Sequence, residues 1–170
     1  MPRVGGADDE TNDGHVLSPI PSPPDDMSSR ARTSRFRIPA DHTAVPPVRE
    51  ALARQLHREG WADEATGIVL LALSEALSNA IDHGSPRGGT VDVELVADHD
   101  MARFTVRDRG RRGERCPLAT PRAPAPTALR GRGLIIMERL ADHLERRAMA
   151  GGTEIIADFH ASTDAVDHAA

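Results

Sequence analysis

Residues 70–84 constrain the fold and the chemistry of this chain more than any other stretch. They read LLALSEALSNAIDHG, where Ala and Leu dominate and no proline interrupts, which predicts a helix. Glu75, Asn79 and His83 follow one another at intervals of four residues, so they lie along one side of that helix. A buried carboxylate and amide are costly unless something satisfies them, and a hydrated Mg²⁺ would do so. Taken alone, such a pair most often faces solvent or caps a loop, so its assignment depends on motifs further along.

The composition excludes several classes of protein. The chain has 170 residues, 39% of them hydrophobic, with three Phe, one Trp and no Tyr, which predicts one domain with an aliphatic core. A net charge of −5 argues against a general nucleic-acid binder. Lysine is absent, so any basic side chain on a phosphate must be Arg. A single cysteine, no visible signal peptide and no apolar run long enough for a bilayer predict a cytoplasmic protein without a membrane partner.

The order of the expected elements predicts an α+β fold. Alternating and amphipathic patterns indicate a strand, two helices, a strand hairpin, a further helix and a second hairpin. Such an order favours a two-layer sandwich, in which a mixed, mainly antiparallel sheet is covered on one face by three helices. Residues 1–33 are expected to be a disordered arm, 34–160 the domain and 161–170 a disordered tail. The expected elements span 35–38, 43–60, the central helix, 90–97 with 102–106, a helix from 134, and 145–149 with 153–159.

Two further motifs lie where a nucleotide site would need them. Asp108 ends a strand and Gly110 follows it, so the carboxylate could accept the exocyclic amine of adenine while the glycine lets the base approach. Gly131-Arg132-Gly133-Leu134 opens a helix whose free N–H groups and dipole suit phosphate oxygens. Between these motifs, residues 109–130 are long enough for a lid. Each feature alone could be an ordinary turn or a disordered insertion; their joint occurrence favours a nucleotide site.

These motifs together resemble those of the ATPase superfamily shared by gyrase, Hsp90, histidine kinases and MutL. Residues 75–84 resemble its N-box, Asp108-Arg109-Gly110 the first half of its adenine box, 131–134 its phosphate box, and Gly151-Gly152-Thr153 its late Gly-Thr element. The closing His-Gly of the N-box is typical of the branch of anti-sigma factors that are serine-protein kinases. Arg112 stands where the family's adenine box has a second glycine. No phosphoacceptor histidine helix is visible, which argues against a sensor histidine kinase.

The resemblance implies a role for each motif. Glu75 would be the general base that activates a Ser or Thr hydroxyl of a protein substrate, and Asn79 would coordinate Mg²⁺. Asp108 would hydrogen-bond adenine, and Thr153 would support the adenine pocket through its hydroxyl. His83, which closes the N-box, is placed with the nucleotide-site residues in a structural role. The cofactor-binding residues expected are Asn79, His83, Asp108, Gly110, Gly131, Arg132, Gly133, Leu134 and Thr153.

The implied function is that of an ATP-binding anti-sigma factor with serine/threonine-protein kinase activity. Its partners would be a STAS-type anti-anti-sigma protein, which it phosphorylates, and a sigma factor, which it sequesters. The alternative is a nucleotide-loaded protein-binding switch without kinase turnover. Glu75 favours the kinase, because a pure binding module needs no base there, whereas the altered adenine box favours the switch. A homodimer is an option in this family that the sequence does not decide.

Overall fold

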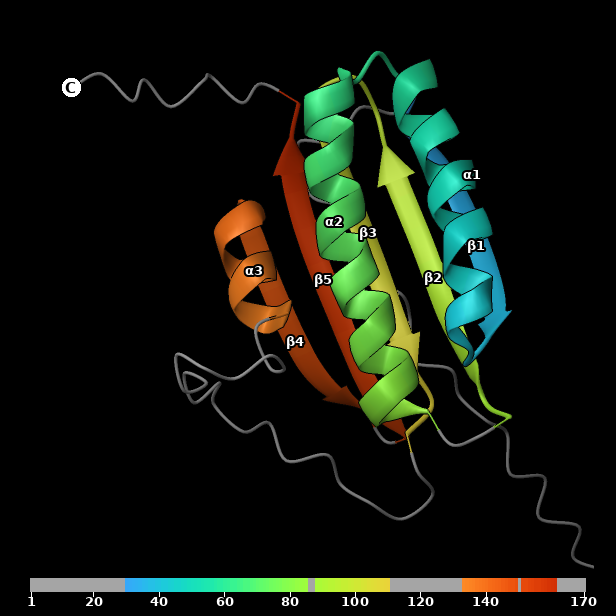
Figure 1. The fold of residues 1–170 in the computed structure, drawn as a ribbon. Coiled ribbons are helices and arrows are strands. Elements are labelled where there is room, and N and C mark those ends of the chain that lie inside the picture. Colours follow the sequence, from blue (N-terminus) through green and yellow to red (C-terminus); the bar gives the residue numbers. More distant parts are fainter. Residues whose placement is uncertain (1–29, 86–87, 111–132, 150, 162–170) are drawn as a thin grey trace, which may run out of the picture.

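The computed structural model describes residues 30–85, 88–110, 133–149 and 151–161. Within these ranges five strands and three α-helices form two layers (Figure 1). The arm up to residue 29, the lid residues 111–130 and the tail from 162 lie outside the described residues. The elements are β1 (Arg32–Pro39), a 3₁₀ turn (His42–Ala44), α1 (Val45–Arg58), α2 (Asp63–Asn79), a π-helical turn (Ala80–Gly84), β2 (Thr90–Ala97), β3 (Met101–Asp108), α3 (Gly133–Leu140), β4 (His143–Met149) and β5 (Gly152–His160).

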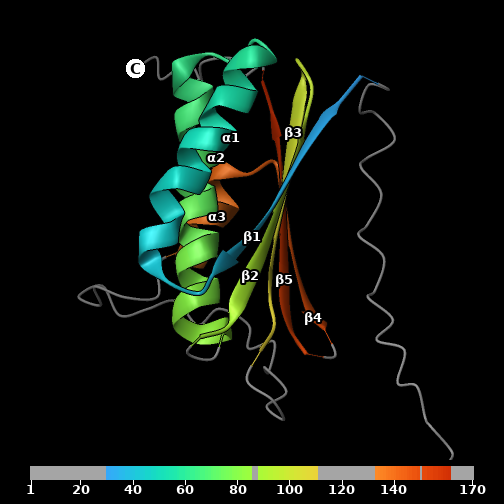
Figure 2. The same ribbon diagram turned by 90° about the vertical axis from the view of Figure 1, so that its right-hand side faces the viewer.

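The sheet has the strand order β1-β2-β3-β5-β4, and each of these neighbouring pairs is antiparallel. All three helices lie on one face of the sheet (Figure 2). The expected α+β sandwich is thereby confirmed, and the sheet is antiparallel rather than mixed among the described strands. β5 lies between β3 and β4 in the sheet. The second strand of the β4–β5 hairpin therefore pairs with the second strand of the β2–β3 hairpin.

The boundaries expected for the first strand and for the central helix were wrong. β1 begins at Arg32, inside the stretch expected to be a disordered arm, because its pairing with β2 extends to Arg32 opposite Ala97. The central helix is α-helical only to Asn79 and then widens into the π-helical turn at 80–84. The backbone N–H of Ser85 donates to the carbonyl of Ala80 at 2.8 Å, five residues back, which closes this wider turn.

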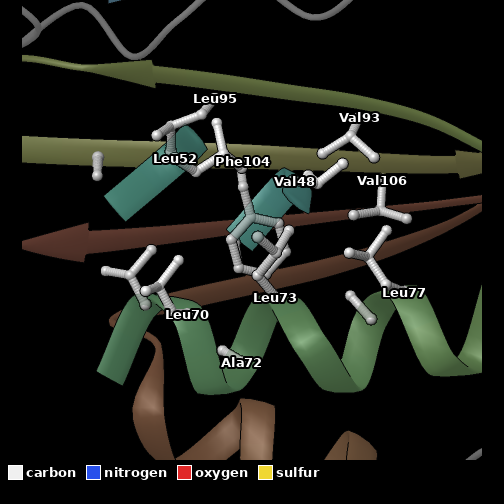
Figure 3. Packing of buried hydrophobic residues seen from close by; sticks show 14 of the residues in the cluster. Val48, Leu52, Leu70, Ala72, Leu73, Leu77, Val93, Leu95, Phe104 and Val106 are labelled. Atoms are coloured by element: carbon white, nitrogen blue, oxygen red, sulfur yellow. The ribbon is translucent and has the colours of Figure 1, made fainter. Parts of the chain in front are cut away.

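The helix α2 is the centre of the core. It packs on the sheet with one face, and α1 and α3 both pack against it. Leu73 and Leu77 of α2 lie over Phe104 and Val106 of β3 (Figure 3), and these four side chains are almost entirely buried. The span Asp63–Gly84 has the length and composition to cross a membrane, yet half of it is buried inside the fold. Its apolar character is therefore explained by a core helix covered on several sides.

The N-terminal end of α2 is anchored by Trp61. The indole Nε1 of Trp61, just before the helix, donates to the carbonyl of Asp98 at 2.7 Å. Asp98 in turn accepts from the backbone N–H groups of Asp100 and Met101, at 2.9 Å each, and so shapes the turn between β2 and β3. The start of α2 is thus tied to the β2–β3 hairpin, whose second strand ends at Asp108.

A pair of variants tests this placement of α2. Leu73 is 1% exposed, so Leu73→Ala is expected to lower the free energy of unfolding by about 2–5 kcal/mol. Leu71, on the same helix, is 47% exposed, and Leu71→Ala should cost less than about 1 kcal/mol. Urea denaturation followed by circular dichroism measures both. Equal losses in the two variants would contradict the orientation of α2.

Candidate nucleotide-binding site

The end of α2 brings Glu75 and Asn79 beside the first residue of α3. A Cβ atom built on Gly133 would lie 2.7 Å from Oε2 of Glu75 and 3.4 Å from Nδ2 of Asn79. A side chain at position 133 would therefore push the glutamate away. The carboxylate, the amide and the start of the phosphate-box helix form one cluster, as the sequence predicts for Glu75, Asn79 and Gly133.

Within the residues that the structure describes, neither Glu75 nor Asn79 has a hydrogen-bonding or ionic partner. Both side chains are partly buried. Polar groups at such a place normally have a partner, because desolvating them without one costs free energy. Two partnerless side chains at the start of a helix are therefore suited to an external ligand.

His83 is not part of this cluster. It lies exposed on the π-helical turn, and no hydrogen bond in the described chain joins it to Glu75 or Asn79. A π-helical turn holds more residues per turn than an α-helix, so the expected row of three side chains does not continue regularly beyond Asn79. The neighbouring Asp82 pairs with His42 (Oδ1 to Nε2, 2.9 Å), which ties the turn to the segment before α1.

A second cluster surrounds Asp108 at the end of β3. Its Oδ1 accepts from the backbone N–H of Gly110 at 2.9 Å and from that of Thr153 at 3.1 Å. Gly110 has a φ of 60°, and a Cβ there would lie 2.9 Å from the carbonyl oxygen of Gly151. A Cβ on Gly152 would lie 2.6 Å from Oδ1 of Asp108. The structure thus brings together Asp108, Gly110 and Thr153, and Thr153 contributes its backbone N–H to the carboxylate. The role expected for the Thr153 hydroxyl stays a prediction.

Burial raises the pKa of the Asp108 carboxyl. The two backbone N–H groups and the positive charge of Arg146 act in the opposite direction. Arg146 stands opposite Ile155 in the register of β4 and β5, on the same side of the sheet as Thr153. The protein therefore holds a carboxylate in a partly desolvated position, which is common at functional sites.

Arg146 and Gly84 are the residues of this region to which the sequence analysis gave no role. Gly84 is the last residue of the N-box, whereas Arg146 lies outside the motifs. Arg146 lies on the same face of β4 as Leu144 and Ala148, so a charge among the helix-facing residues of a strand was an available signal. Gly84 ends the π-helical turn with its backbone against the side chain of Asp108. It joins the cluster around Asp108 to the helix that carries Glu75 and Asn79.

Part of the expected site falls beyond the described chain. Gly131 and Arg132 lie outside the described residues, as does the lid from residue 111 onward. Leu134, the last residue of the phosphate box, is partly buried and packs against the hydrophobic core. Of the expected phosphate box, the structure describes Gly133 and Leu134, where α3 begins.

The donor set fits Mg²⁺ bound together with a nucleotide. Among the described residues no group of three or more His, Cys, Asp or Glu side chains could hold a metal ion by itself. Mg²⁺ needs no such group when substrate phosphates and waters supply most of its ligands and the protein adds one or two oxygens. Asn79, with a partly buried amide that has no hydrogen bond in the described chain, is suited to be one of them.

The raised pKa of Asp108 predicts a pH-dependent stability. Its ionised form is less favourable in the folded protein than in the unfolded chain, so stability should fall as pH rises from the ordinary Asp pKa of about 4 through the raised one. Asp108→Asn keeps an oxygen for the two N–H groups and carries no charge. The variant should therefore gain in free energy of unfolding relative to wild type at neutral pH, and this gain should shrink in acid. Urea denaturation across the pH range measures it; a pH-independent difference would contradict the burial effect.

Known proteins are similar to this chain in sequence and in fold. The family model described as "Histidine kinase-like ATPase domain" matches residues 38–159. Over 153 residues the chain is 28% identical to the serine-protein kinase RsbW of Bacillus pumilus (strain SAFR-032), covering 84% of this chain and 94% of that protein. The crystal structure of the RsbU and RsbW domains of Rv1364c from Mycobacterium tuberculosis has a TM-score of 0.56 at 23% identity. That match covers 75% of this chain and 31% of the other one, and it shows the fold alone.

The family match runs from the end of β1 to the end of β5 and so includes both clusters of the site. It confirms the resemblance that the N-box, the adenine box and the phosphate box indicate. This chain belongs to the histidine kinase-like ATPase family.

Proposed function

We propose that this chain is an ATP-dependent serine/threonine-protein kinase that acts as an anti-sigma factor. The observation that carries the proposal is the cluster at the start of α3, where Glu75 and Asn79 meet Gly133 and have no partner in the described protein. The cluster around Asp108, joined to it through Gly84, supports a nucleotide lying across both. The name of the Bacillus pumilus relative, a serine-protein kinase, supports a protein as the phosphate acceptor.

Glu75 would be the general base of the reaction. Its carboxylate would take the proton of a Ser or Thr hydroxyl while that oxygen attacks the γ-phosphorus of ATP. The new O–P bond would form as the bond from the γ-phosphorus to its bridging oxygen breaks, and ADP would leave. Because no side chain in the described protein engages the carboxylate of Glu75, it is available to an incoming hydroxyl.

The remaining residues would bind and orient the nucleotide. Asn79 would hold Mg²⁺ through its amide oxygen, and the ion would neutralise charge on the phosphates. The backbone at the start of α3 would donate to phosphate oxygens. Asp108 would accept the amine of adenine, with Gly110 and Thr153 fixing its carboxylate. Within this proposal Gly131, Arg132 and Leu134 complete the phosphate box, His83 keeps its structural role, and residues 109–130 close over the nucleotide.

The proposed partners follow from the same family branch. A STAS-type anti-anti-sigma protein would be the phosphorylation target, and a sigma factor would be held inactive, so transcription is regulated without direct contact to nucleic acid. Both encounters would take place in the cytoplasm. The proposed organisation is one ATPase domain, 34–160, between an N-terminal arm and a C-terminal tail.

Nucleotide binding is the first property to test. Calorimetry of the purified chain should detect ATP binding that requires Mg²⁺, and Asn79→Ala should weaken it by roughly tenfold or more, since a metal ligand is lost. Leu71→Ala, on the exposed side of the same helix, serves as the matched control and should bind as wild type does. If wild type binds no ATP with Mg²⁺, the kinase proposal fails and the chain is a protein-interaction module on an ATPase fold.

Phosphotransfer is the second property. With labelled ATP and a STAS-domain protein from the same organism, wild type should phosphorylate a Ser or Thr of that protein. Glu75→Gln should keep ATP affinity and lose roughly 100-fold or more in rate, because the base is removed while shape and size stay the same. Glu138→Gln, on the exposed side of α3, controls for a general loss of charge. Nucleotide-dependent binding of the partner without transfer by wild type would instead support the switch without turnover.

A further inference from the structure

Gly84 is packed directly against the side chain of Asp108. A Cβ built on Gly84 would overlap Cγ and Oδ2 of Asp108 and lie 2.6 Å from its Cβ. Non-bonded carbon atoms come no closer than about 3.5 Å at their optimum. Three consecutive atoms of the aspartate would be affected, so the clash could not be relieved by moving the tip of a long, flexible side chain.

The aspartate has little freedom to move aside. Its Oδ1 accepts from the N–H groups of both Gly110 and Thr153, which come from two different strand ends. Gly152 approaches from the other side, where a Cβ would lie 2.6 Å from the same oxygen. Turning the carboxylate away from position 84 would break both hydrogen bonds. A side chain at 84 must therefore displace either Asp108 or the end of the π-helical turn.

The two oxygens of Asp108 have different surroundings. Oδ1 is engaged by the backbone, whereas Oδ2, the oxygen beside Gly84, makes no hydrogen bond within the described part of the chain. Oδ2 is thus the oxygen that remains for a ligand amine, and the direction in which it points is set by the contact of the carboxylate with the backbone of Gly84.

We propose that Gly84 is a positioning residue for nucleobase selection: its missing side chain seats the Asp108 carboxylate so that Oδ2 meets the exocyclic amine of adenine. This inference rests on the proposed nucleotide function and on the role of Asp108 within it. It also couples the two halves of the site, because the turn that ends with Gly84 continues the helix that carries Glu75 and Asn79.

The test compares ATP with purine riboside triphosphate, which lacks the exocyclic amine, by calorimetry with Mg²⁺. Wild type should prefer ATP by roughly tenfold or more, the value of a hydrogen bond to a charged group. Gly84→Ala should reduce this preference toward one. Gly67→Ala is the matched control, because it makes the same change in α2 where a Cβ would meet nothing within 4 Å. It should keep the preference, and a merely structural defect in Gly84→Ala would lower the affinity for both nucleotides equally.

Asp108→Asn separates this inference from the function on which it rests. If Asp108→Asn keeps the full preference for ATP, the adenine role of Asp108 fails and the inference fails with it. If Asp108→Asn loses the preference while Gly84→Ala keeps it, the inference alone is overturned. If both lose it, the double variant Gly84→Ala/Asp108→Asn should be no less selective than Asp108→Asn, since the two changes act on one contact.

A double-mutant cycle of thermal stability between positions 84 and 108 tests the inference even if Gly84→Ala folds poorly. Removing the side chain at 108 should remove the clash, so Gly84→Ala should cost much less stability in an Asp108→Gly background than in wild type. Thermal unfolding without nucleotide measures all four proteins. An equal cost in both backgrounds would show that Gly84 does not act through Asp108 and would overturn the inference.

Discussion

The packing of α2 between the sheet and its two neighbouring helices is the interaction on which the rest of the structure depends. The helix can be apolar on several sides because β3 lies beneath it and α1 and α3 lie beside it. Trp61 ties its start to the turn before β3, and Gly84 closes its end against the last residue of β3. Since both ends of α2 are tied to the same hairpin, Glu75 and Asn79 are held at a defined place relative to Asp108.

Close backbone approaches at glycine connect the parts of the site. The backbone of Gly133 lies close to the side chains of Glu75 and Asn79, and that of Gly84 lies close to the side chain of Asp108. Gly110 and Gly152 allow the ends of β3 and β5 to approach each other around the Asp108 carboxylate. A side chain at 84 or 152 would take space that Asp108 occupies, one at 133 would meet Glu75, and one at 110 would meet the carbonyl of Gly151. These glycines therefore matter because they have no side chain at a close contact, more than because they make the chain flexible.

The site contains arrangements that do not favour the stability of the folded protein. Asp108 is partly buried with its pKa raised, and Glu75 and Asn79 lack partners in the described protein. The opposite face of the sheet shows the contrast, because there the charges are paired across strands in register, as Arg103 is with Asp158 at 2.5 Å. Partly buried side chains without a partner in the described chain, such as Glu75 and Asn79, are typical of a fold that keeps a binding site at some cost in stability.

The sequence by itself determined the elements and the kinds of residue in the site. Periodicity located the two hairpins and the helices, and the motifs named Glu75, Asn79, Asp108 and Gly133, because local patterns and residue chemistry are written in neighbouring residues. Only the tertiary structure decided the strand order, the π-helical turn, the backbone contact from Thr153 and the exposed position of His83. It also decided the close approach of Gly84 to Asp108 and the position of the Arg146 charge near that carboxylate. These depend on register and packing between segments far apart in the chain, such as 84 with 108 or 75 with 133. Local propensity does not encode such contacts, since the same residues would continue an ordinary α-helix or strand if nothing packed against them.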